Sequence, residues 1–292
     1  MLETFDTDRF RRALVPVIAV VLGLGMLAAV AGTPSDEETG RPEIAAPAPD
    51  ASTTTMLDTA DPGAASVPDA GEAPPTSAAP STTAPLGPAA VPAPGVYRYD
   101  VDEVRDGQVS TRSEQREITM LGEEDGLTIV QLVASSDGER QASVLAWSPD
   151  QVQVRSTRIE NEGAPARDCT WDPPFLEFGR LENGGQWTVE STCTTDVAGL
   201  PTTFVVRGAS RVVGEAEVVH AGVPARAWQV ERDRTTTITA TVGNDAVEQV
   251  VREVGTFFVD PARGLTLRSD VTVTLTGAQE GESRRTSVLV EG

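Results

Sequence analysis

The chain has 292 residues and a formal net charge of −21, and its 23 basic residues are all arginine because it contains no lysine. The absence of lysine excludes Schiff-base chemistry, a phosphate-loop lysine and a lysine general base. The acidic excess argues against non-specific binding to nucleic acid or anionic lipid. One histidine and two cysteines leave few ligands for a transition metal and little material for a nucleophile–histidine pair.

An apolar run at residues 13–32 contains no charged residue and follows a polar N-terminus that ends in an arginine-rich segment. About 20 residues with a rise of ~1.5 Å each match the ~30 Å hydrocarbon core of a bilayer, so we expect a transmembrane signal-anchor helix. The arginines favour a cytoplasmic location for residues 1–12 and export of everything after the run. A cleaved secretory signal is the alternative, because Ala29, Val30 and Ala31 form a small-residue cleavage pattern, and the protein would then be secreted.

Residues 33–95 contain no aromatic residue, nine acidic residues and one basic residue, Arg41, among many prolines, alanines, serines and threonines. This composition buries too little apolar surface to offset the chain entropy, so we expect a disordered stalk between the membrane and a folded domain. A plain spacer is the simpler interpretation. The alternative is a stalk with O-linked sugars on its threonine clusters, Thr53, Thr54, Thr55, Thr82 and Thr83.

Residues 96–292 contain every tryptophan, tyrosine and cysteine of the chain and are expected to form an extracytoplasmic domain. Period-two alternation dominates, and turn pairs such as Asp106-Gly107 and Asp137-Gly138 separate the apolar runs. Residues 160–181 are less regular and are expected to include a short helical turn. More than ten strands without crossover helices predict an all-β fold, an antiparallel curved sheet that is a barrel, a half-barrel or a sandwich. The strands are expected at residues 97–102, 109–121, 127–134, 140–147, 151–159, 186–195, 202–207, 211–219, 225–232, 235–242, 246–259, 265–275 and 283–290.

The two cysteines, Cys169 and Cys193, lie 24 residues apart and lack the C-x-x-C spacing of a redox or zinc site. Because the domain is expected outside the cytoplasm, we predict a structural disulfide between them. Closing a loop of this length contributes roughly 3.5 kcal/mol in the chain-entropy model. A catalytic thiol is the alternative interpretation.

No arrangement of residues in the sequence predicts catalysis. His220 ends a strand without a partner serine, cysteine or acid at a recognisable spacing, so a surface turn is favoured over a proton shuttle. The acid pairs Glu123-Glu124 and Asp102-Glu103 are expected to lie on opposite faces of a strand or in solvent rather than to act as general acid and base. No calcium-loop pattern occurs, and we expect neither a metal nor a cofactor.

The tryptophans are the largest apolar residues of the domain, and most simply they belong to its core. The alternative is that Trp147, Trp187 and Trp228 line a concave sheet and form an apolar face for a lipid-like ligand. The sequence alone leaves both interpretations open.

Two motifs in the C-terminal half suggest a relationship. Gly185 and Trp187 open a strand that precedes the segment at residues 212–228, and residues 256–267 form a strand, a turn that ends in Gly264, and an apolar return strand. These motifs resemble a family of uncharacterised β-rich exported cell-envelope proteins, related in architecture to the half-barrel lipoprotein carriers. That family commonly has Trp-Tyr ahead of the turn, where this chain has Phe-Phe. The resemblance implies a curved antiparallel sheet with a concave apolar face for acyl chains, and it carries over no catalytic residue.

Export, a β-domain large enough for a core and the lack of a catalytic arrangement predict a non-enzymatic binding module of the cell envelope. The module would be anchored in the membrane through residues 13–32 and would hold an apolar or lipid-like ligand on its curved sheet. The alternative is a structural or interaction protein that docks another envelope protein, and an acid-dependent hydrolase comes third. None of these interpretations includes a nucleic acid as partner.

Overall fold

The computed structural model describes residues 86–161, 166–197, 199–242 and 245–292. The predicted cytoplasmic N-terminus (1–12), the anchor helix (13–32) and the stalk as far as residue 85 lie outside these residues. In the described part, no helix is both long enough and apolar enough to cross a bilayer. Residues 86–94, which their composition places in the stalk, contact the folded domain, so that domain begins before Val96.

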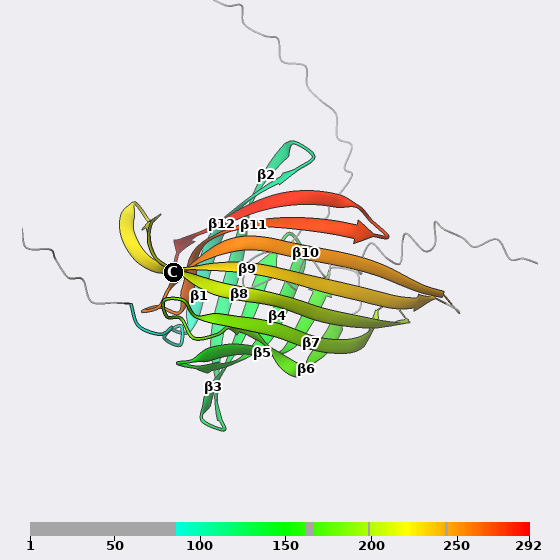
Figure 1. Ribbon diagram of the computed structural model, residues 1–292, viewed down its shortest axis with the longest axis horizontal. Helices are drawn as coiled ribbons and strands as arrows, with labels where there is room; N and C mark the ends of the chain where they lie inside the picture. Colours follow the sequence, from blue (N-terminus) through cyan, green and yellow to red (C-terminus); the bar gives the residue numbers. More distant parts are fainter. Residues whose placement is uncertain (1–85, 162–165, 198, 243–244) are drawn as a thin grey trace, which may run out of the picture. The chain divides into compact units, whose positions relative to one another are not determined.

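In the part of the chain that the structure describes, twelve antiparallel strands form one closed barrel, in which each strand pairs with its neighbours in sequence and β1 also pairs with β12. In Figure 1, β8, β9 and β10 run along the long axis in front of the more steeply inclined β4. The all-β antiparallel prediction is confirmed, and of the three expected architectures the protein adopts the barrel. The strands are β1 (Gly95–Arg105), β2 (Gln108–Glu124), β3 (Leu127–Ser136), β4 (Glu139–Ser148), β5 (Gln151–Asn161), β6 (Arg167–Phe178), β7 (Gln186–Val197), β8 (Leu200–His220), β9 (Val223–Val242), β10 (Asp245–Asp260), β11 (Leu265–Gly277) and β12 (Gly281–Glu291).

Alternation of side chains and tight turns explain why these residues form hairpins. In β1, Tyr97, Tyr99 and Val101 are buried inside the barrel while the residues between them are exposed. The predicted turn at Asp106-Gly107 is present, and both residues have positive φ, at 51° and 76°. This is the type I′ geometry whose twist matches that of paired strands, and aspartate–glycine is among the sequences that adopt it.

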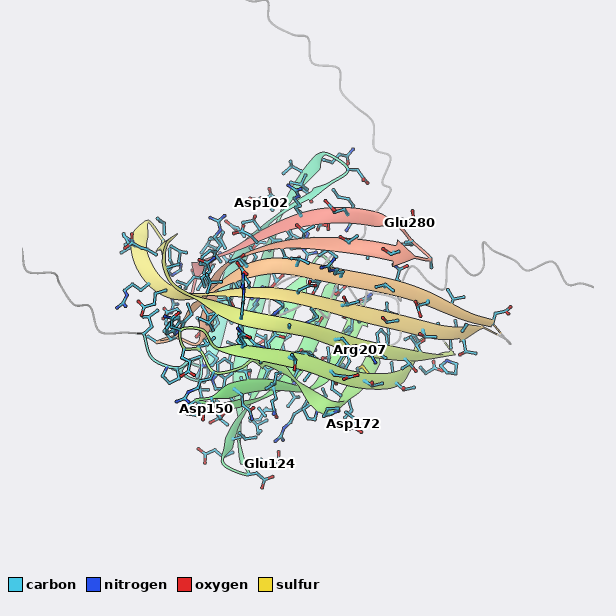
Figure 2. All side chains as sticks on the ribbon, viewed as in Figure 1. Asp102, Glu124, Asp150, Asp172, Arg207 and Glu280 are labelled. Atoms are coloured by element: carbon cyan, nitrogen blue, oxygen red, sulfur yellow. A yellow bond between two sulfur atoms is a disulfide. The ribbon has the colours of Figure 1, made fainter. Side chains whose placement is uncertain are left out.

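The exterior of the barrel is charged. Figure 2 labels six exposed charged residues, Asp102, Glu124, Asp150, Asp172, Arg207 and Glu280. Cross-strand ion pairs such as Arg207–Glu190, with Nε and Oε1 3.1 Å apart, lie on this surface. Such exposed pairs contribute little to stability because water screens them.

Two sequence-based expectations about the strands are wrong. Among the described residues of the range 160–181, the strand β6 takes the place of the expected helical turn, although Pro173 and Pro174 lack the N–H groups that a strand ladder uses. The expected breaks near residues 208–210 and 233–234 are also absent, because β8 and β9 continue through them. Gly208 lets β8 continue through this point. A Cβ at this position would lie 2.5 Å from the carbonyl oxygen of Asp233, and because glycine has no Cβ the backbones of β8 and β9 can approach closely.

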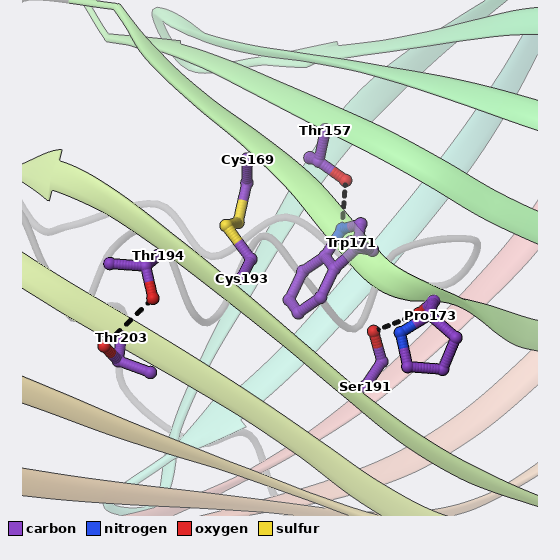
Figure 3. The surroundings of a disulfide bond; sticks show 8 residues. All are labelled: Thr157, Cys169, Trp171, Pro173, Ser191, Cys193, Thr194 and Thr203. Carbon is purple, nitrogen blue, oxygen red and sulfur yellow. Dashed lines mark hydrogen bonds between the residues drawn. A yellow bond between two sulfur atoms is a disulfide. The ribbon is translucent and has the colours of Figure 1, made fainter.

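The join between β6 and β7 differs from the others. Only one residue pair, Asp172 with Thr192, is in ladder register between β6 and β7, whereas β8 pairs with β9 from Thr202 to His220. The predicted disulfide between Cys169 and Cys193 spans this join, and the Ser191 hydroxyl donates a hydrogen bond to the Pro173 carbonyl at 2.6 Å (Figure 3). The covalent link therefore holds together two strands that the backbone ladder joins weakly.

Replacement of both cysteines, Cys169→Ala with Cys193→Ala, is expected to lower the free energy of unfolding by about 3.5 kcal/mol in the chain-entropy model. The loss should be accompanied by faster amide hydrogen exchange in β6 and β7 than in β8 and β9, because only the former pair depends on the link. Denaturant unfolding and exchange mass spectrometry measure the two effects. Wild-type protein under reductant is the control, and an unchanged exchange pattern at β6 and β7 would contradict the assigned role.

Candidate functional site

The interior of the barrel is divided between an apolar chamber and a charged centre. The chamber encloses about 30 Å³, which is room for one or two water molecules. Its lining is aromatic and aliphatic except for Arg116 and Thr266. The lining residues are Pro92, Tyr97, Tyr99, Arg116, Ile118, Val130, Leu132, Leu145, Trp147, Phe178, Gly264, Leu265 and Thr266.

Residues 86–94, here called the N-terminal strap, cover this end of the barrel. The backbone N–H of Leu86 donates to the Glu215 carboxylate at 3.0 Å, and that of Ala90 donates to the Pro261 carbonyl at 2.7 Å. Pro92 is buried against the chamber, and the apolar side chains of Leu86, Ala89 and Val91 pack on the core. The strap thus contributes apolar surface that fills the barrel end, together with a small number of backbone hydrogen bonds.

Two of the predicted ligand-face residues lie directly beneath the strap. The indole of Trp228 donates its Nε1–H to the Gly87 carbonyl at 3.0 Å, and the indole of Trp147 donates to the Ala89 carbonyl at 3.4 Å. Both side chains are almost fully buried. Buried indoles need an acceptor for their N–H group, and here the strap backbone supplies both acceptors.

Trp187 and Trp171 lie elsewhere in the interior. Trp187, the third residue of the predicted ligand face, packs edge-on against Phe178 with ring centroids 6.4 Å apart, and through Phe178 it adjoins the chamber. Its indole Nε1 is buried and has no hydrogen-bond partner among the described residues. Trp171 donates to the Thr157 hydroxyl at 3.2 Å and contacts Phe175, as a core residue would.

Arg116 is the only formally charged residue in the chamber lining. Its guanidinium lies 3.8 Å from the centroid of the Tyr99 ring and forms an ion pair with Glu114. Burial disfavours the charged form, but the attraction of Glu114 outweighs it and raises the pKa of Arg116 above its ordinary value. Burial also raises the pKa of Tyr99. The polar wall of the chamber therefore consists of a stacked, charged guanidinium beside a neutral phenol.

A cluster of buried charges, here called the charged centre, consists of Glu177, Arg232 and Arg234. It adjoins the chamber through Phe178, a lining residue whose ring contacts Arg232. Glu177 is fully buried between two arginines, with Oε1 2.7 Å from Arg232 Nη1 and Oε2 2.7 Å from Arg234 Nη2. Burial opposes ionisation of Glu177, but the two guanidinium groups lower its pKa below the ordinary value. The Arg232 guanidinium also lies 4.3 Å from the centroid of the Phe257 ring, which shields it from water. This cluster was not predicted from the sequence, although Arg232 and Arg234 are two positions apart in a strand and so share a face.

His220 lies at the end of the β8–β9 hairpin and is half-buried. Its Nδ1 lies 3.1 Å from the Leu289 carbonyl oxygen, and Arg263 Nη1 lies 3.1 Å from its Nε2. The ring therefore bridges the hairpin to β12 and to the β10–β11 turn. No metal-ligand group of three or more His, Cys, Asp or Glu side chains occurs among the described residues.

Glu139 lies inside the barrel at the start of β4, near the charges of Arg167, Arg112, Arg285 and Glu114. Burial raises its pKa from 4.5 to about 7 because desolvation outweighs the attraction of the arginines. The folded state thus binds a proton that the unfolded state releases between pH 4.5 and 7, so this group makes the free energy of unfolding fall as pH rises through that window.

Glu139→Gln should remove that contribution. From pH 4.5 to pH 8 the wild type is expected to lose up to about 3 kcal/mol of stability relative to the variant, on the basis of ~1.4 kcal/mol per pKa unit. Denaturant unfolding of both proteins at half-unit steps of pH measures the difference. Parallel stability curves would contradict the assignment, and the exposed Glu280→Gln variant is the control.

Comparisons with known proteins add little to this description. No family model matches the chain, and no relative is found among curated proteins. Among solved structures, the hypothetical lipoprotein YmcC from Escherichia coli K12 is similar over 66% of this chain and 86% of its own length, with 11% sequence identity and a TM-score of 0.25. A likeness at this level supports no statement about function, and the fold assignment rests on the twelve paired strands themselves.

Proposed function

We propose that this protein is a non-enzymatic binding module of the cell envelope that holds an apolar, lipid-like ligand in the chamber beneath the N-terminal strap. The observation that carries the proposal is the pairing of the Trp147 and Trp228 indoles with strap carbonyls. Two large aromatic side chains at the end of the barrel depend for their hydrogen bonds on a segment that is not part of any strand.

A ligand would replace the strap rather than add to it. The enclosed space of about 30 Å³ is far below the ~300 Å³ or more of typical small-molecule sites. The strap is held by a few hydrogen bonds, each with a net contribution of about 1 kcal/mol, and by modest apolar contacts. An acyl chain offers similar apolar area, and the oxygens of its carboxyl or ester group would accept the indole N–H bonds that the strap gives up.

The envelope location rests on the predicted anchor and on the acidic exterior. A domain tied to a membrane through residues 13–32 has access to lipids, while its charged outer surface keeps the barrel itself in water. The alternative, docking of another envelope protein without a small ligand, leaves the chamber and its strap without a role.

Photo-crosslinking tests the proposal with the full-length chain in its membrane. Cells are given a palmitate analogue with a diazirine in its acyl chain, the protein is purified after illumination, and mass spectrometry locates the modified residues. Modification is expected at chamber positions such as Leu132, Leu145 and Leu265. Leu132→Trp, which fills the chamber, should reduce modification at the remaining positions at least fivefold.

Val109→Trp is the matched control, because it adds the same side chain at an exposed position of the neighbouring strand. This variant should be modified like the wild type. Absence of chamber modification in the wild type, or equal modification in the Leu132→Trp variant, would overturn the proposal. Crosslinks confined to another envelope protein would favour the docking alternative.

A further inference from the structure

A second charged group lies around Glu103, close to the end of β1 remote from the strap. Three arginines surround its carboxylate. Arg105 Nη2 lies 2.9 Å from Oε1, Arg112 Nη1 lies 3.0 Å from Oε2, and Arg285 Nη2 lies 3.7 Å from Oε2. Burial disfavours the Glu103 carboxylate, but these arginines lower its pKa below the ordinary value. One carboxylate thus lies among three guanidinium groups and is largely shielded from water.

The strand register directs these side chains to one point inside the barrel. Val101 is buried and is paired with Arg112 on β2 and with Ser287 on β12. Glu103, two residues further along β1, is paired with Arg285 on β12. Because paired residues of antiparallel strands share a face, Arg112, Arg285 and Ser287 all face inward across the width of three adjacent strands.

Several hydrogen-bond donors of this group have no hydrogen-bond acceptor among the described residues. They are Arg112 Nε and Nη2, Arg285 Nε and Nη2, and the Ser287 hydroxyl, and all are buried. The carboxylate of Asp137 lies 3.9 Å from Arg112 Nε, beyond hydrogen-bond distance. Burial lowers the pKa of Arg285 to about 10, which leaves it charged at neutral pH but incompletely compensated by Glu103. Unpaired buried donors of this kind carry a desolvation cost that an acceptor would relieve.

Nearby carboxylates supply little further compensation. Glu114 forms its ion pair with Arg116, and Glu139 is about half protonated at pH 7 because burial raises its pKa to about 7. Glu253 also acts on Arg285, but burial raises the pKa of Glu253 and so disfavours its charged form. A cluster with surplus positive charge and fixed planar donors matches a tetrahedral oxyanion, whose several oxygens accept bidentate hydrogen bonds from guanidinium groups.

We propose that Arg112, Arg285 and Ser287 form a binding site for an oxyanion of the phosphate or sulfate class. The site lies near the opposite end of β1 from the strap and is independent of the proposed lipid chamber. Arg105 and Arg112, whose side chains are 37% and 10% exposed, provide the approach from solvent. The bound anion is either a free ion from solution or the headgroup of an acidic lipid.

Titration of the purified full-length protein with inorganic phosphate tests the site. At pH 6.5, where most of Glu139 is protonated, and at constant ionic strength with chloride as the replaced anion, phosphate should bind with saturation and raise the unfolding temperature. Arg285→Met is expected to weaken binding at least tenfold. Arg284→Met is the matched control, because Arg284 precedes it on β12 and its side chain is 76% exposed, so its affinity should be unchanged.

Ser287→Ala keeps every charge and should weaken binding several-fold, so the proposal stays testable if Arg285→Met does not fold. A second titration with dihexanoyl phosphatidic acid separates the two sources, since a headgroup site should prefer the lipid and a free-anion site should not. The proposal would be overturned if neither phosphate compound had a saturable effect beyond that of chloride. Equal affinities in the wild type and in both Ser287→Ala and Arg285→Met would also overturn it.

Discussion

Closing twelve strands into a barrel creates an interior that has to be filled, and the rest of this structure follows from how the chain fills it. Barrel diameter grows with strand number, and about eight strands already enclose as much space as ordinary side chains occupy. Here the additional space holds tryptophans, buried arginine–glutamate clusters such as Glu177 with Arg232 and Arg234, and the strap at one end. Long side chains and a segment from outside the strands replace a purely aliphatic core.

This filling has an energetic consequence. Buried ion pairs contribute little net stability, because desolvation offsets the attraction, but removal of one partner leaves an uncompensated charge and is costly. Glu177 depends on two arginines, which in turn lie over the Phe178, Phe257 and Phe175 rings. The charged centre therefore fixes the arrangement of the interior more than it stabilises it.

Much of the fold could be predicted from the sequence, because alternation and turn chemistry are local. The Asp106-Gly107 hairpin and the strand that contains Tyr97 are examples. The errors have physical causes. The prolines of β6 are typical of a loop, so the local pattern predicts no strand there. The strand tolerates them because β6 and β7 share few ladder hydrogen bonds and are joined by the disulfide. The polar residues Arg232 and Arg234 predict a break within β9, but in the structure both side chains are buried inside the barrel.

The site was only partly predictable for the same reason. Of the predicted ligand-face residues, Trp147, Trp187 and Trp228, the structure places Trp147 and Trp228 beneath the strap and Trp187 against Phe178. Glu177 is separated by more than fifty residues from the arginines it contacts, and no local pattern connects them. The strap is rich in proline and alanine like the stalk, so its composition alone predicts disorder. Its contacts with residues far away in the sequence, such as Trp147 and Trp228, distinguish it.

The central claim is that the strap closes the apolar end of the barrel and that a ligand displaces it. The most direct measurement is the ¹H–¹⁵N spectrum of the tryptophan indoles in the full-length protein, recorded with and without oleate. The account predicts that the Trp147 and Trp228 signals shift together as oleate is added while the Trp171 signal, whose indole is bonded to Thr157, does not move. Unchanged Trp147 and Trp228 signals at saturating oleate, or an equal shift of Trp171, would contradict it.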